Sequence, residues 1–145
     1  MTIEKDLPEG EGIELEAKTE NLHQATEFVE SFLDNVGCPM KSLMQINIAV
    51  DEIFTNISSY AYPSGTGMAK IEVKMEDDPR AVLITFTDSG IPYDPLAKDD
   101  PDVTLSVKER QIGGLGIFMA KKLMDEITYA YRDGKNILTM KKFLQ

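Results

Sequence analysis

The sequence predicts an α+β fold, a two-layer sandwich with helices on one face of a mostly antiparallel, mixed sheet. Strand-like and helix-like periodicities follow in the order strand, helix, helix, strand, strand, helix, strand, strand. This order lacks the regular strand and helix alternation of a doubly wound parallel sheet. With 145 residues and 42% apolar side chains, the chain suits one domain around one core. We therefore expect a single domain over residues 1–145.

The first strand is expected at residues 12–18, where apolar and charged side chains alternate with a period of two. A helix should follow to Val36, with Asn21 as its N-cap, because apolar residues recur at helical spacing and Gly37 ends the pattern. The same spacing predicts a second helix from about Lys41 to Ala61.

Two strand patterns come next, at residues 69–76 and 81–87, and the turn residues between them predict an antiparallel pair. Residues 88–112 are rich in Asp, Pro, Gly and Ser and predict a long loop, and such loops in compact domains are usually functional or disordered. A third helix is expected at about 115–125, followed by a hairpin that turns around residues 133–136.

Composition restricts the partners. The excess of 25 acidic over 15 basic residues gives a net charge of −10, which repels nucleic acid and anionic membranes. A macromolecular partner is therefore expected to be a protein. The single cysteine, Cys38, excludes an internal disulfide, and the N-terminal segment lacks the pattern of a signal peptide, so we expect a cytoplasmic protein.

Glu52 and Asn56 are the first candidate functional residues. They lie four residues apart on the second predicted helix, so they project from nearly the same side, at the edge of its apolar stripe. A carboxylate beside a carboxamide can accept a proton and supply an oxygen to Mg²⁺. The pair taken alone favours a solvated helix face.

Asp88 and Gly90 follow the apolar strand pattern directly, where a strand gives way to a loop. A carboxylate at this place can accept a hydrogen bond from the exocyclic amine of adenine, and a glycine lets the backbone approach the ring. A plain Asp-Gly turn is the alternative.

The third candidate group is the turn Gly113-Gly114-Leu115-Gly116 before the third predicted helix. Glycines leave room for phosphate, and the N–H groups that open a helix attract it without many basic side chains. A flexible hinge would look the same. The turn lacks the Gly-Lys-Ser/Thr ending of a P-loop.

In this order the three groups resemble the GHKL ATP-binding fold, also called the Bergerat fold, of gyrase-type ATPases, histidine kinases and Hsp90. INIAVDEIFTNISSYAY, DSGIPYDP and GGLGIFMAKKLMDEITYAYRDGKNILTMKK are similar to the short anti-sigma factor serine kinases of bacteria, the RsbW and SpoIIAB type.

The resemblance implies a role for each candidate residue. Glu52 would be the general base, Asn56 the Mg²⁺ ligand, and Asp88 and Gly90 would contact adenine. The turn from Gly113 to Gly116 would close over the ATP phosphates, with residues 96–112 as the ATP lid.

Two departures from the family pattern affect the assignment of these roles. Ile112 stands where some relatives have an arginine before the lid glycines, with Lys108 and Arg110 nearby. Tyr60 and Tyr62 occupy a region where many relatives carry a histidine.

The expected function is that of an anti-sigma factor and serine/threonine protein kinase, which uses MgATP to phosphorylate a STAS-domain anti-sigma antagonist in a partner switch. The resemblance also implies a homodimer and a sigma factor as partner. The alternative is an ATP-binding regulatory module that sequesters a protein partner without kinase activity.

Overall fold

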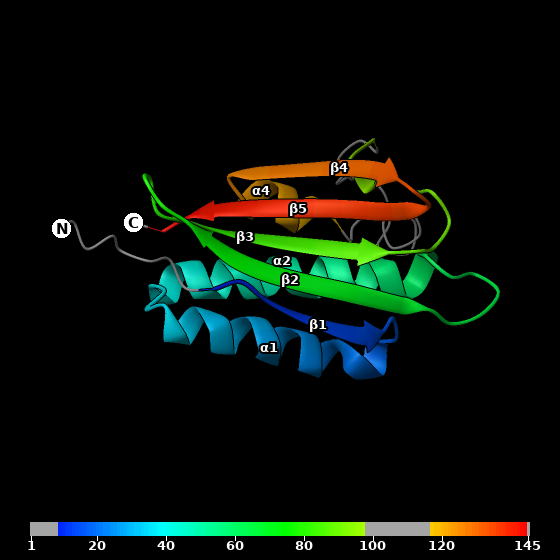
Figure 1. Ribbon diagram of the computed structural model, residues 1–145, viewed down its shortest axis with the longest axis horizontal. Coiled ribbons are helices and arrows are strands. Elements are labelled where there is room, and N and C mark those ends of the chain that lie inside the picture. The colour runs from blue at the N-terminus through cyan, green and yellow to red at the C-terminus, as the bar shows by residue number, and fades with distance from the viewer. Residues whose placement is uncertain (1–8, 98–116, 145) are drawn as a thin grey trace, which may run out of the picture.

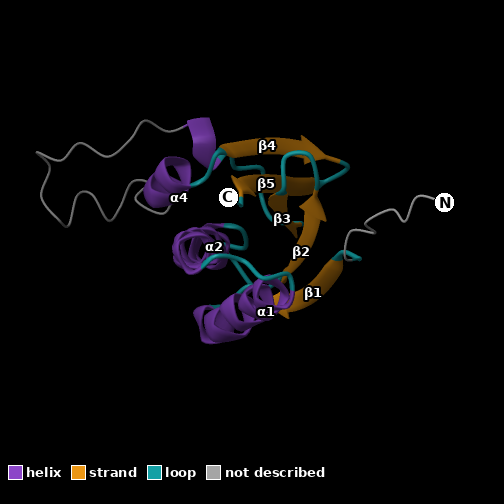
Figure 2. Cartoon of the chain, turned by 90° about the vertical axis from the view of Figure 1, so that its left-hand side faces the viewer, coloured by secondary structure: helices purple, strands orange, loops and turns teal. Residues whose placement is uncertain are grey.

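The structure, a computed structural model, describes residues 9–97 and 117–144 and has an α+β architecture. The elements in chain order are β1 (Glu11–Glu16), a 3-10 turn (Thr19–Asn21), α1 (Leu22–Asn35), α2 (Met40–Tyr60), β2 (Met68–Glu76), β3 (Ala81–Asp88), a 3-10 turn (Pro95–Ala97), α4 (Phe118–Leu123), β4 (Glu126–Arg132) and β5 (Lys135–Phe143). Helices α1, α2 and α4 lie on one side of the sheet (Figure 1, Figure 2).

The sheet has five strands in the order β1-β2-β3-β5-β4, and every pairing in it is antiparallel. β2 alternates buried and exposed side chains along most of its length, as expected for a strand with one face covered. The predicted layers are therefore confirmed, with a sheet that is antiparallel throughout its described strands.

The core lies between α1, α2 and the inner face of the sheet. α2 contributes the longest buried stripe, because apolar residues recur along it every three or four positions. Its fully or almost fully buried apolar side chains are Ile46, Ala49, Val50, Ile53 and Phe54. They pack in one cluster with strand residues such as Ile71, Ile84 and Phe86.

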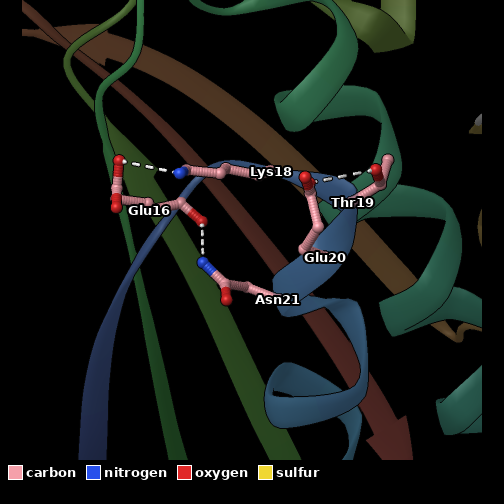
Figure 3. A network of polar contacts seen from close by, with 5 residues as sticks. All are labelled: Glu16, Lys18, Thr19, Glu20 and Asn21. Carbon is pink, nitrogen blue, oxygen red and sulfur yellow. Dashed lines mark hydrogen bonds and ion pairs between the residues drawn. The ribbon is translucent and has the colours of Figure 1, made fainter.

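The predicted N-cap of α1 is only partly correct. Asn21 occupies the N-cap position, but its side chain makes no capping hydrogen bond. Its Nδ2 instead donates to the Glu16 carbonyl oxygen at 2.9 Å, beside an ion pair between Lys18 and Glu16 (Figure 3). The asparagine therefore ties the start of the helix back to the end of β1.

The C-terminal hairpin has a tighter turn than the sequence predicts. Asp133 and Gly134 form the turn with φ of 53° and 77°, while Lys135 and Asn136 already belong to β5. A two-residue turn with positive φ at both positions matches the right-handed twist of the flanking strands. Asn136 is thereby moved from an expected turn into the sheet.

α4 spans Phe118–Leu123 in the described part of the chain and is thus shorter than the helix predicted at residues 115–125. Residues 98–112 of the predicted lid and the turn from Gly113 to Gly116 lie outside the described residues. Within the described ranges, no helix has both the length and the apolar character needed to cross a membrane.

Candidate functional site

The candidate site lies at the end of β3, where the sheet meets the C-terminal half of α2. A small pocket there is lined by Ile53, Asn56, Ile57, Phe86, Asp88, Pro95, Tyr129, Asn136 and Leu138. Two of the predicted site residues, Asn56 and Asp88, therefore face the same space although they are far apart in the sequence.

Asp88 is buried at the last position of β3, and its two oxygens differ in their surroundings. Oδ1 accepts hydrogen bonds from the Gly90 N–H and from Asn136 Nδ2, both at 2.9 Å. No described residue donates to Oδ2. This carboxylate thus keeps acceptor capacity beside the pocket, as a partner for an amino group would require.

Asn136 is the polar residue at this site that sequence analysis missed. It is 7% exposed and sits directly across from Asp88 in the β3–β5 register. Its Nδ2 also donates to the Ile91 carbonyl at 2.9 Å, and its Oδ1 accepts from the Tyr93 N–H at 3.2 Å and from the Tyr129 hydroxyl. One side chain therefore holds β3, the following loop and β4 in register.

Gly90 is required by packing as well as by its predicted closeness to a ligand. A Cβ at this position would lie 2.2 Å from the carbonyl oxygen of Ala61, which also accepts the Ile91 N–H at 2.9 Å. Such a contact is impossible without moving the backbone. The glycine therefore allows the loop after β3 to lie against the end of α2.

Tyr62 adds a second tie between these segments. Its hydroxyl donates to the Met68 carbonyl at 2.7 Å and accepts the Ser89 N–H at 2.9 Å. Tyr60 also contacts the loop, with its ring centroid 5.9 Å from that of Tyr93. Tyr60 and Tyr62 thus both support the loop after β3.

Glu52 lies one turn before Asn56 on α2 and is half-buried. Its Oε1 accepts the Ala120 N–H at 2.6 Å and its Oε2 accepts the Met119 N–H at 3.3 Å, both in the first turn of α4. Burial raises the pKa of the Glu52 carboxyl above its ordinary value, and the two N–H groups act in the opposite direction. Glu52 therefore joins α2 to the start of α4.

Asn56 is 8% exposed, and its side chain makes no hydrogen bond to another described residue. A carboxamide oxygen in this state is a suitable ligand for Mg²⁺, which prefers oxygen and usually keeps several waters or phosphate oxygens. The described residues contain no cluster of three or more His, Cys, Asp or Glu side chains that could hold a metal. A magnesium ion would thus need further oxygens from its nucleotide.

The pocket has a volume of about 30 Å³. This is roughly the volume that one molecule occupies in liquid water, so a purine ring does not fit beside the present lining. Pro95 is buried in that lining and belongs to the short turn after the β3 loop. Entry of a ring therefore requires part of this lining to move outward.

Replacing Asn136 with leucine should destabilise the protein, because Asp88, Tyr93 and Tyr129 would lose a buried partner. We expect the free energy of unfolding to fall by about 1–3 kcal/mol, the cost of leaving buried polar groups unsatisfied. Urea denaturation measures this change. Tyr129→Phe removes the hydroxyl that donates to Asn136 and accepts the Tyr93 N–H at 3.3 Å. It should nevertheless cost less, because Asn136 still holds Asp88 and Ile91. An Asn136→Leu midpoint equal to that of the parent protein would contradict the described network.

Comparison with known proteins places the chain in a family. Residues 15–142 match the family model described as "Histidine kinase-like ATPase domain". Serine/threonine-protein kinase BtrW of Bordetella bronchiseptica is 32% identical over 95 residues, which are 66% of this chain and 66% of that protein. Serine-protein kinase RsbW of Halalkalibacterium halodurans is 28% identical, and the match covers 99% of this chain and 84% of that protein.

Anti-sigma F factor of Clostridium acetobutylicum is 28% identical over 88% of this chain and 89% of its own length. The crystal structure of the RsbU and RsbW domains of Rv1364c from Mycobacterium tuberculosis superposes with a TM-score of 0.62 at 17% identity, covering 94% of this chain and 33% of that one. This structural likeness confirms the fold.

The resemblance expected from the sequence is thus confirmed, and two of the relatives bear the name of the expected enzyme class. The match to the family model extends over most of the chain, from the end of β1 into β5. It includes Glu52, Asn56, Asp88 and Asn136. The chain belongs to the histidine kinase-like ATPase domain family.

Proposed function

We propose that this protein is an ATP-dependent serine/threonine protein kinase that acts on a protein partner. The observation that carries the proposal is the shared pocket of Asn56 and Asp88, with Glu52 one helical turn away on α2. In this proposal Glu52 serves as the base, Asn56 as the metal ligand and Asp88 as the adenine contact. The names of the kinase relatives support the same reaction.

In the proposed reaction Asp88 Oδ2 accepts a hydrogen bond from the exocyclic amine of adenine, while Asn136 fixes Oδ1. Asn56 would hold Mg²⁺ against the phosphates, where the ion neutralises charge when bound. Glu52 takes the proton of a serine or threonine hydroxyl as its oxygen bonds to the γ-phosphorus. The bond from that phosphorus to the bridging oxygen breaks, and ADP leaves with the electron pair.

The partner proposed for this activity is a STAS-domain anti-sigma antagonist, with a sigma factor as the second partner of the same chain. The relative named anti-sigma F factor supports this assignment. The net charge of −10 supports a protein rather than a nucleic acid as the direct partner. The proposed domain extends over the whole chain, with residues 96–112 as the lid and the turn from Gly113 to Gly116 at the phosphates.

A second candidate is a nucleotide-binding module that captures its partner without phosphotransfer. The observation that favours it is the engagement of both Glu52 oxygens with the N–H groups of α4. In that form the carboxylate is a helix cap and not a base. The kinase therefore requires Glu52 as a base, whereas the binding module requires it only as a cap of α4.

Glu52→Ala separates the two functions. The kinase proposal predicts that transfer of phosphate to a cognate antagonist falls by at least about a hundredfold, the lower range for general base catalysis, while nucleotide affinity changes little. Transfer is measured with radiolabelled ATP and the purified antagonist, and affinity by calorimetry. Transfer that persists in the variant would exclude Glu52 as the base, and the absence of transfer by the parent chain would leave the binding module.

Acidification should reduce kcat/KM by protonating Glu52. Because burial raises the pKa of this carboxyl above its ordinary value, the acidic limb of the profile should have its midpoint above that of an ordinary glutamate. The pH dependence of ATP affinity, measured in parallel, separates protonation of the nucleotide from protonation of the enzyme. A flat profile through this range would contradict the role of Glu52.

Asp88→Asn should weaken ATP binding on the order of tenfold to a hundredfold, because an amide that turns its NH₂ to the pocket opposes the amine of adenine. Asp133→Asn is a matched control, since Asp133 is exposed in the hairpin turn with positive φ, which asparagine tolerates. Calorimetry measures both affinities. Equal affinities in the two variants would refute the adenine contact.

A further inference from the structure

A row of exposed apolar side chains runs along the outer side of α2. Met40, Met44 and Ile48 are 67%, 59% and 43% exposed and recur at every fourth position. Residues four apart on a helix are neighbours on its surface, so these side chains form a continuous ridge. We name this set the α2 row. The next two positions of the same spacing are Glu52 and Asn56.

The α2 row borders a groove between α1 and α2. These helices lie side by side on the same face of the sheet (Figure 2). The groove has a volume of about 380 Å³, and Ile48 belongs both to its lining and to the α2 row. Its walls carry three acidic side chains: Glu27, Glu30 and Asp51.

The acids of the groove remain available for a partner. Glu27 is 68% exposed, and its Oε2 lies 3.1 Å from His23 Nε2 on its own helix. Glu30 accepts Asn47 Nδ2 at 3.1 Å, and Asp51 accepts the Thr55 hydroxyl at 3.3 Å. A carboxylate can accept several hydrogen bonds, so each of them can still receive a cationic donor. The described residues that line the groove include no lysine or arginine.

We propose that the groove and the α2 row form a docking surface for a basic amphipathic helix of a partner protein. Apolar side chains of that helix would cover Met44 and Ile48, and its lysine or arginine side chains would pair with Glu27, Glu30 and Asp51. Laying an apolar helix face against such a ridge is a common mode of peptide recognition, and complementary charge sets its orientation and specificity.

The acidic charge of the docking surface argues against nucleic acid, anionic membranes, a second copy of the chain and the undescribed segments of this chain as its occupant. Nucleic acid and anionic membranes are repelled by this surface. A second copy that docked through the same groove would bring the three acids against each other. The sequence outside the described residues offers no basic helix, because residues 1–8 have two acidic and one basic side chain and residues 98–116 have four acidic and three basic ones.

The docking surface goes beyond the proposed kinase function and does not depend on it, because docking requires no nucleotide. It lies one turn from Glu52 along the same row, so a helix bound there would adjoin the proposed base. A partner anchored at this surface would therefore be held near the site whether or not it is phosphorylated.

The probe for this surface is a synthetic helical peptide of about 18 residues, with leucines on one face and lysines on the other. It is titrated into the full chain carrying ¹³C-labelled methionine methyl groups, without nucleotide. The signals of Met40 and Met44 should shift, whereas that of Met68, which is 45% exposed on β2, should stay in place. Equal shifts at all three, or none at Met40 and Met44, would overturn the proposal.

A charge-matched pair of variants then tests the acids. Glu27→Gln/Glu30→Gln/Asp51→Asn keeps the hydrogen bonds to Asn47 and Thr55 but removes three charges, and should weaken peptide binding on the order of tenfold. The control, Glu11→Gln/Glu14→Gln/Glu72→Gln, removes three exposed acids of β1 and β2 and should change affinity less than about twofold.

Equal losses in the two variants would show unspecific attraction to an acidic protein and would refute the docking surface. A control peptide with glutamate in place of lysine should not bind, and shifts of Met40 and Met44 with that peptide would refute the role of charge. If these signals depend on protein concentration before any peptide is added, a second copy occupies the groove and the proposal is wrong.

Discussion

The burial of one face of α2 against the sheet is the interaction on which the rest of the molecule depends. The same helix supplies the centre of the core and, at the edge of its buried stripe, Glu52 and Asn56. A helix fixed by so many apolar contacts cannot rotate without breaking the core, because close-packed interiors resist small displacements. The direction of the Glu52 and Asn56 side chains is thus set by residues such as Ile53 and Phe54, whose side chains carry no polar or reactive group.

The sequence predicted the elements whose pattern is local. The period of α2 is long and unambiguous, and the alternation in β2 is regular, so both were placed within one or two residues. Asp88 was found because it ends a strand. Asn136 was missed because a single polar residue after Asp-Gly is typical of a turn, and only the pairing of β5 with β3 gives it a partner. The bonds from Glu52 to α4 span 67 and 68 residues and leave no local signal.

The contacts of Glu52 and the small volume of the pocket belong to a conformation that must change before a nucleotide can bind. The carboxylate satisfies N–H groups at the start of α4, which are the kind of donors that otherwise attract an anion. Pro95 belongs to the lining of a pocket that is too small for a purine ring. Rearranging the pocket lining would cost free energy, and this cost reduces the observed affinity.

The pairing of Asp88 with Asn136 across β3 and β5 also has a consequence for how this family can diverge. A shift of β5 by one residue would bring Lys135 or Ile137 opposite Asp88, and would turn every side chain of the strand to the other face. The two-residue turn at Asp133 and Gly134 fixes the alignment of β4 with β5. Insertions or deletions in that turn, although it is exposed and is not part of the pocket lining, should be selected against as strictly as changes in the pocket itself.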